Sequence, residues 1–171
     1  MSTAGCTRRV PDRLILMRHA KSDYPPGVAD HDRPLNARGR RDAAAAGEWL
    51  AQQRANLVTG GLSVLVSSAE RAQQTWAIAG DGLATAYATE PRIYEASVST
   101  LVELCESQDA GTVLIVGHNP TLEQCVHHLA AASQDAVMKT CAIAVLDLDP
   151  SDPWASGTAT LAALQTPRAG G

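Results

Sequence analysis

Short apolar runs along the chain alternate with longer amphipathic or alanine-rich stretches. The runs predict strands at 14–17, 62–66, 112–116, 141–148 and 158–164, with a shorter extended piece within 85–94. Strands that alternate with helices are typical of βαβ units, which build parallel sheets. Only a short turn-rich segment separates the last two runs, which predicts an antiparallel hairpin at one edge. We therefore expect an α/β fold, a three-layer α/β/α sandwich with a mostly parallel central sheet and an antiparallel edge.

The stretches between the strands predict helices at 36–53, 69–79, 97–106 and 120–132. Asn36 is a suitable N-cap for the first helix, and Ser97 or Ser99 for the third. Asn119 followed by Pro120 is typical of an N-cap and the first helical position. This pair predicts the start of the last helix.

The 171 residues are expected to form one domain, 1–171, with a substantial buried core. The ends, about 1–12 and 165–171, are expected to be loose, and the proline-rich segment 20–35 predicts a loop. The sequence shows no signal peptide and no membrane-spanning run, and its four cysteines form no CxxC pair. These features favour a cytoplasmic protein with reduced thiols and no membrane partner.

The charge balance is slightly acidic, with 14 Lys and Arg against 18 Asp and Glu, a net charge of -4. No stripe rich in Lys and Arg offsets it, so nucleic acid is not expected as the main partner. Arg38, Arg40 and Arg41 do cluster near the start of the first expected helix. They have two interpretations: a solvated helix face, or a surface that binds or steers an anionic substrate.

Histidine and arginine side chains follow three of the expected strands. Arg18 and His19 end the first strand, His118 ends another, and Arg71 follows a third. In an open α/β sheet, ligands bind outside the carboxyl ends of the strands, where residues far apart in sequence converge. Two guanidinium groups and two imidazoles suit an anion with several oxygens, and phosphate is the natural candidate.

Each of these four side chains has an expected role at a phosphate. His19 is the candidate nucleophile, because a neutral imidazole can attack phosphorus and carry the phosphoryl group. Neighbouring cations would help to keep this imidazole neutral. Arg18 and Arg71 would hold the phosphate oxygens with forked donors. A protonated His118, next to a helix N-terminus, would stabilise the transferring oxygens.

A general acid near the phosphate would protonate an ester oxygen as it leaves. Glu95 is the leading candidate, since it follows the third extended segment. Asp23 and Asp32, in the loop after the first strand, are rivals for this role.

The remaining histidines do not suggest a metal. His127 and His128 are adjacent and face different sides of their expected helix, so they cannot act as i, i+4 ligands. His31 stands alone between two aspartates, which is weak evidence for a metal. We therefore expect no metal site and no cofactor.

Four segments together resemble the histidine phosphatase superfamily, the phosphoglycerate-mutase-like fold. They are Leu16-Met17-Arg18-His19-Ala20, the stretch 66–75, Tyr94-Glu95-Ala96 and Val116-Gly117-His118-Asn119-Pro120, in the family's order. The resemblance implies that His19 is the phosphorylated nucleophile and that Glu95 is the proton donor. It also implies a phosphate pocket formed by Arg18, Arg71 and His118. The stretch 32–39 resembles the small branch that includes bacterial phosphohistidine phosphatases. Ala20 departs from the glycine that many members have after the nucleophile.

These observations favour a metal-independent phosphatase that acts on a phosphorylated substrate through a phosphohistidine intermediate on His19. A phosphohistidine protein, a small phosphate ester and a nucleotide-type substrate all fit. A phosphohistidine would depend less on Glu95, because a phosphoramidate leaving group departs more readily than an alkoxide. The alternatives are a phosphomutase and a non-catalytic module that binds phosphate or a phosphoprotein on the same fold.

Overall fold

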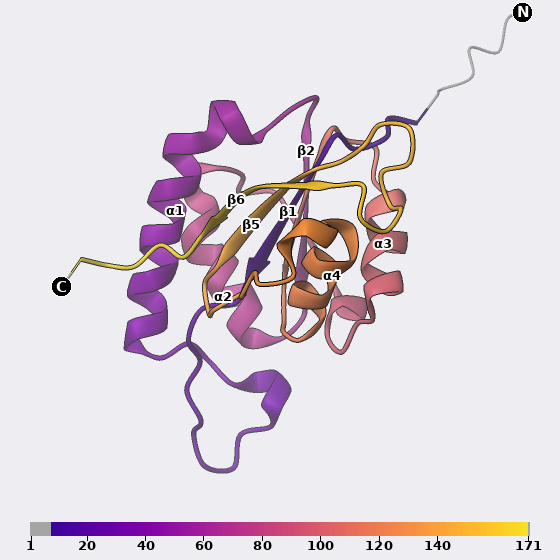
Figure 1. Cartoon of the computed structure of the whole chain (residues 1–171). Helices are drawn as coiled ribbons and strands as arrows, with labels where there is room; N and C mark the ends of the chain where they lie inside the picture. The colour runs from indigo at the N-terminus through magenta and orange to yellow at the C-terminus, as the bar shows by residue number, and fades with distance from the viewer. Residues whose placement is uncertain (1–7, 171) are drawn as a thin grey trace, which may run out of the picture.

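The computed structural model describes residues 8–170, in which six strands alternate with four α-helices (Figure 1). The strands are β1 (Arg13–Arg18), β2 (Leu62–Ser67), β3 (Ala88–Glu90), β4 (Thr112–Gly117), β5 (Ile143–Asp147) and β6 (Thr160–Gln165). The helices are α1 (Ala37–Leu57), α2 (Glu70–Ala79), α3 (Val98–Glu106) and α4 (Thr121–Leu129). The predicted order of strands and helices is confirmed.

All six strands form one sheet in the order β3-β2-β4-β1-β5-β6. The strands β3, β2, β4 and β1 pair in parallel, whereas β5 is antiparallel to β1 and β6 is antiparallel to β5. The mostly parallel sheet with an antiparallel edge is therefore confirmed. The register pairs Arg18 of β1 with Gly117 of β4, so His19 and His118 follow side by side.

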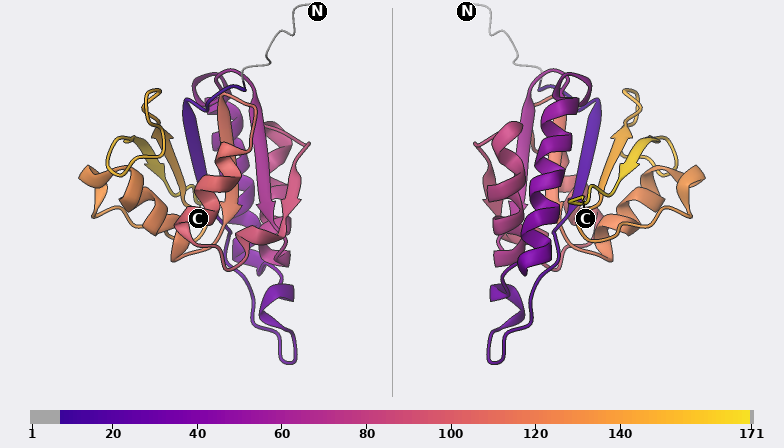
Figure 2. Two further views of the ribbon diagram at one scale, coloured as in Figure 1. Left: turned by 90° about the vertical axis from the view of Figure 1, so that its right-hand side faces the viewer. Right: turned by 90° about the vertical axis from the view of Figure 1, so that its left-hand side faces the viewer.

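Helices cover both faces of the sheet, which confirms the three-layer sandwich. Alternate residues of β1 point to opposite faces. Ile15 and Met17 join the core under α1 and α2, while Leu14 and Leu16 join the core under α3 and α4. Figure 2 shows α2 and α4 on opposite sides of β1. Because both faces are buried, β1 reads in the sequence as a continuous apolar run.

The start of α1 fixes the loop that follows β1. The side chain of Asn36 caps the helix, as predicted, and accepts a hydrogen bond from Gly39 N at 2.8 Å. Gly39 lies against the backbone of Lys21, where a Cβ atom would collide with the carbonyl group. The first turn of α1 therefore holds the chain just after His19 in place.

The start of α4 differs from the prediction. The helix begins at Thr121 with Pro120 at the N-cap, and no side chain caps it. Asn119 instead donates from Nδ2 to Met138 O at 3.0 Å. The predicted asparagine N-cap is therefore wrong, because a long-range contact uses its amide. The helix also ends at Leu129, before its expected end, where the chain passes into a 3-10 turn.

Parts of both chain ends, expected to be loose, are hydrogen-bonded to the domain. Asp12 N donates to Gly111 O at 2.8 Å, and Arg168 Nη1 donates to the carboxylate of Asp42 at 2.9 Å. The expectation for residues 1–7 and 171 lies outside the described residues. Across residues 8–170, no helix has both the length and the apolar character to cross a membrane.

Candidate active site

His19 lies just past the end of β1, next to the end of β4. Its main-chain N donates to Gly117 O at 3.0 Å. The ring Nδ1 lies 2.7 Å from Ala20 O, and Arg71 Nε donates to Nε2 across 3.3 Å. Because a guanidinium group only donates, Nε2 is the acceptor and Nδ1 carries the hydrogen. The unprotonated nitrogen of His19 therefore faces Arg71.

The imidazole of His19 is neutral at neutral pH. Burial lowers the pKa of His19 from 6.5 to about 3, although the hydrogen bond to Ala20 acts in the opposite direction. The neighbouring His118, Arg71 and Arg18 lower the pKa further. Neighbouring cations were expected to help keep this imidazole neutral, and removal from water is the larger cause.

His118 lies beside His19, with the two ring centroids 5.1 Å apart. Its Nε2 is 2.7 Å from Ser67 Oγ, and its buried Nδ1 has no hydrogen-bond partner within residues 8–170. Burial, followed by the charge of Arg71, lowers the pKa of His118 from 6.5 to about 4. The lowered pKa favours the neutral form of His118 at neutral pH without a bound anion, and a protonated form beside a bound phosphoryl group stays a prediction. A neutral His118 still offers one N–H group to an anion.

Arg71 is held in place beside His19. Its Nη1 donates to Asp30 O at 2.7 Å, and its Nη2 donates to Asp30 Oδ2 at 3.2 Å. The side chain is buried although its charge opposes the dipole at the start of α2. Arg18 donates from Nη1 to Met138 O at 2.8 Å, while its buried Nε has no partner in the described chain.

The loop between β1 and α1 and the segment between β3 and α3 add residues that the sequence did not assign to the site. The carboxylate of Asp30, which binds Arg71, also accepts a hydrogen bond from Tyr94 OH at 2.8 Å. The ring of Tyr94 packs edge-on against His118 and His31, at centroid distances of 5.7 and 4.9 Å. The one available signal, a histidine between two aspartates, was considered only as a metal site.

A cavity of about 230 Å³ opens beside Asp30, Arg71, Tyr94 and His118, whereas His19 and Arg18 are not among its lining residues. Its lining residues are Asp30, Arg71, 93–96 and 118–121. Glu95 is exposed at this lining and has a left-handed backbone conformation, with a φ of 62°.

The other two candidate acids make local contacts instead. Asp23 accepts a hydrogen bond from Tyr24 N at 2.9 Å, and Asp32 contacts His31 Nδ1 at 3.1 Å. Neither lines the cavity. Of the three candidate proton donors, the structure thus places Glu95 at the cavity.

The remaining histidines lie elsewhere on the fold. His127, in α4, contacts the carbonyl oxygen of Ala136 at 2.8 Å, and His128 is exposed on the same helix. Residues 8–170 contain no cluster of three or more His, Cys, Asp or Glu side chains that suits a metal ion. The expected absence of a metal stays a prediction.

Comparison with known proteins gives the family. The model of the histidine phosphatase superfamily (branch 1) matches residues 14–103. An uncharacterized protein of Mycobacterium tuberculosis is 42% identical over 166 residues, which cover 89% of this chain and 100% of the relative. The phosphohistidine phosphatase SixA of Escherichia coli is 27% identical over 145 residues, which cover 81% of this chain and 87% of that protein.

A solved structure agrees with these relatives. The protein histidine phosphatase SixA complexed with tungstate has a TM-score of 0.74 and 25% identity, covering 91% of this chain and 97% of its own. The chain therefore belongs to the histidine phosphatase superfamily, in its SixA-like branch. This membership supports a phosphatase activity that depends on histidine.

Proposed function

We propose that this protein is a metal-independent phosphatase that removes the phosphoryl group from a phosphohistidine in a protein, through a covalent intermediate on His19. The observation that carries the proposal is the orientation of the His19 ring. Its Nδ1 is tied to Ala20 O, and its unprotonated Nε2 faces the guanidinium group of Arg71. A nucleophile beside a fixed cation is what phosphoryl transfer requires, because this reaction depends on positioning and charge stabilisation.

The first step forms the bond between His19 Nε2 and phosphorus while the bond from phosphorus to the substrate nitrogen breaks. The substrate imidazole keeps the electron pair of that bond and leaves neutral, because its other ring nitrogen carries a proton. Arg71 would hold the non-bridging oxygens, a role supported by its guanidinium group lying 3.3 Å from His19 Nε2. Two of the unpartnered buried nitrogens in the described chain, Arg18 Nε and His118 Nδ1, would supply further donors to the same oxygens.

The surroundings of Ser67 support His118 Nδ1 as a donor. Ala69 N donates to Ser67 Oγ at 3.3 Å, and the hydroxyl hydrogen is then free to bond His118 Nε2 at 2.7 Å. With Nε2 as the acceptor, the hydrogen of the neutral ring lies on Nδ1.

The second step is hydrolysis. Water attacks the phosphorus, the bond to His19 Nε2 breaks, and inorganic phosphate leaves while the imidazole returns to its neutral form. The proton lost by water passes to Glu95, which lines the cavity, or to solvent. Glu95 would also protonate an alkoxide leaving group, a requirement that is weaker when the leaving group is an imidazole.

The proposed substrate class draws on the relatives and on the shape of the site. The relative from Escherichia coli is named a phosphohistidine phosphatase, and the tungstate in the solved SixA complex is a tetrahedral oxyanion like phosphate. The cavity of about 230 Å³ has room for a phosphoryl group on an imidazole and is bordered by exposed residues such as Glu95 and Pro120. An accessible rim suits a phosphorylated side chain on another protein.

The test is hydrolysis of an aryl phosphate and of a phosphohistidine peptide in the presence of a chelator. Wild type should turn over both substrates, and His19→Ala should lose the activity by at least about 10³-fold. The exposed His128 provides a matched control, because His128→Ala removes an imidazole on α4 outside the cavity.

Trapping the intermediate separates covalent catalysis from simple binding. Brief reaction with radiolabelled substrate should leave an acid-labile, alkali-stable label on wild type and none on His19→Ala. Binding of phosphate without turnover would instead identify a non-catalytic binding module. Turnover that needs an added metal would contradict the metal-independent mechanism.

A further inference from the structure

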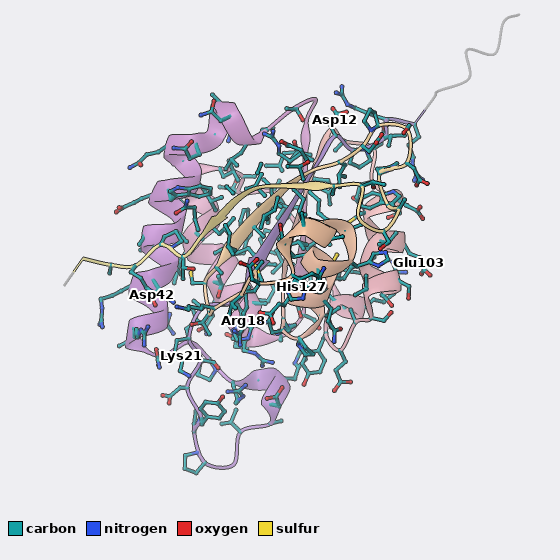
Figure 3. All side chains as sticks on the ribbon, in the orientation of Figure 1. Asp12, Arg18, Lys21, Asp42, Glu103 and His127 are labelled. Carbon is teal, nitrogen blue, oxygen red and sulfur yellow. The ribbon has the colours of Figure 1, made fainter. Side chains whose placement is uncertain are left out.

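A second, larger hollow borders the candidate active site. It has a volume of about 600 Å³ and lies between the start of α1, the segment before β5 and the end of β6. Its lining residues are Arg38, Val137, Lys139, Leu164, Thr166 and Arg168, and we call it the basic groove. Figure 3 labels Arg18 of the site and Asp42, whose carboxylate contacts Arg38 and Arg168 of the groove, in the lower half of the molecule.

The basic groove is positively charged although the whole chain has a net charge of -4. Three of its lining residues are cationic and none is acidic. One buried carboxylate, that of Asp42, lies 2.9 Å from Arg168 and 3.5 Å from Arg38, so it offsets only part of this charge. Lys139 is exposed and has no carboxylate within 4.0 Å in the described chain. The groove therefore keeps an excess of positive charge facing solvent.

One short segment separates the groove from the site. On its inner side, Met138 O accepts hydrogen bonds from Arg18 and Asn119 at 2.8 and 3.0 Å. On its outer side, Lys139 and the 56% exposed Val137 line the groove. A ligand bound in the groove would therefore lie next to the phosphoryl group held at Arg18.

We propose that the basic groove docks an acidic segment of the phosphoprotein substrate, beside the phosphohistidine that enters the site. This inference rests on the proposed function and specifies its substrate: a phosphohistidine protein with Asp and Glu residues near the phosphorylated side chain. Opposite charges would steer the encounter and fix its orientation. The apolar Val137 and Leu164 in the lining, and the lack of any aromatic lining residue, fit a polypeptide better than nucleic acid bases.

The experiment measures binding by fluorescence anisotropy with two labelled peptides. Both carry a stable triazole analogue of phosphohistidine, flanked by glutamates in one peptide and by lysines in the other. Wild type should bind the acidic peptide about 10-fold more tightly than the basic one, and added salt should reduce this preference. Because the analogue is not hydrolysed, the result does not depend on turnover.

The variants reverse or remove the charge of one groove residue, Lys139. Lys139→Glu should reduce the preference for the acidic peptide by about 3- to 10-fold, and Lys139→Gln by a smaller factor. The matched control is Arg8→Glu, which makes the same charge change just before β1, outside the lining of the groove, and should leave the preference within about twofold. Lys139→Glu should also keep the hydrolysis of an aryl phosphate, which is too small to reach the groove.

Several results would overturn the docking proposal. They are equal binding of the two peptides by wild type, an unchanged preference in Lys139→Glu, or an equal loss of aryl phosphate hydrolysis in that variant. Tighter binding of a single-stranded oligonucleotide than of the acidic peptide would assign the groove to nucleic acid instead. Failure of wild type to hydrolyse an aryl phosphate contradicts the proposed function. The preference between the two peptides alone decides whether the basic groove docks an acidic segment.

Discussion

Strand β1 begins and ends with an arginine, and the two side chains have opposite surroundings. At the amino end, Arg13 donates from Nε and Nη2 to Asp147 at 2.9 and 2.7 Å, and from Nη1 to the carbonyl groups that end α1. At the carboxyl end, the side chain of Arg18 makes one hydrogen bond within the described chain, to Met138 O, and its buried Nε has no partner there.

The same contrast extends to the residues around each arginine. Four buried side-chain polar atoms within residues 8–170 have no partner, and three of them, on Arg18, His118 and Asn119, lie at the carboxyl end. At the amino end, the buried Thr112 hydroxyl contacts both N and O of Thr59. Since buried polar groups are normally satisfied, the cluster of unpaired atoms, Arg18 Nε, His118 Nδ1 and the acceptor Asn119 Oδ1, favours a site for a ligand. The amino end of β1 is thus satisfied internally, whereas the carboxyl end keeps unpaired polar atoms for the proposed phosphoryl group.

The largest expected effect comes from the carboxyl end. Arg71→Lys keeps the charge but loses the fork that reaches His19 and Asp30, so kcat/KM for an aryl phosphate should fall by about 10²- to 10³-fold. Arg13→Lys is the matched change at the amino end and should leave kcat/KM within about twofold. Equal losses in the two variants would remove the functional contrast between the ends.

The amino end should dominate stability instead. Arg13→Ala breaks a two-pronged contact with Asp147, so the free energy of unfolding should fall by about 2 kcal/mol. Arg18→Ala loses one hydrogen bond, and its cost should be about 1 kcal/mol or less. Urea unfolding measures both through the midpoint at unchanged slope. A larger loss in Arg18→Ala than in Arg13→Ala would contradict the division.

The sequence predicted the carboxyl end well because its signals are local. Apolar runs in the sequence mark β1, β2 and β4, so the residues just past each strand can be identified from their position. Parallel pairing of the strands then brings His19 and His118 together. The sequence therefore predicted which residues meet at this end of the sheet. Their chemical roles remain a proposal.

The loop contribution could not be predicted in the same way. Asp30 and Tyr94 belong to segments without periodicity, and they reach the site through contacts with Arg71 and with each other, far along the chain. The Asn119 cap failed for a related reason, since its local signal is overridden by the distant Met138 carbonyl. Local sequence patterns predict which residue lies at the end of a strand, but they do not predict which loop packs against that residue.

Acid should lower the free energy of unfolding through the two histidines at the carboxyl end of the sheet. The two site histidines have pKa values lowered from 6.5 to about 3 and about 4, so between these values and 6.5 the unfolded chain binds more protons than the folded one. Their contribution to the free energy of unfolding is therefore complete above pH 6.5 and is lost as the pH falls towards the folded pKa values.

A glutamine in place of His19 removes one of these two groups. The loss of unfolding free energy from about pH 7 to about pH 4 should then be smaller than in wild type by about 1 kcal/mol or more. Chemical denaturation at a series of pH values measures this difference. The control His128→Gln, at an exposed position of α4, should keep the wild-type dependence of the unfolding free energy on pH. The same dependence in His19→Gln would show that His19 is not a source of the acid sensitivity.

The smallest expected effect concerns Asp30, whose carboxylate contacts Arg71 at the site. Its Oδ2 lies 3.2 Å from Arg71 Nη2, so it repels an incoming phosphate while it positions the guanidinium. Asp30→Asn keeps an oxygen for Tyr94 and Arg71 but removes the negative charge. Because the carboxylate is 58% exposed, solvent screens it, and inhibition by inorganic phosphate should strengthen by only about 2- to 4-fold. Weaker inhibition in Asp30→Asn would mean that the carboxylate matters more as the anchor of Arg71 than as a competitor of the substrate.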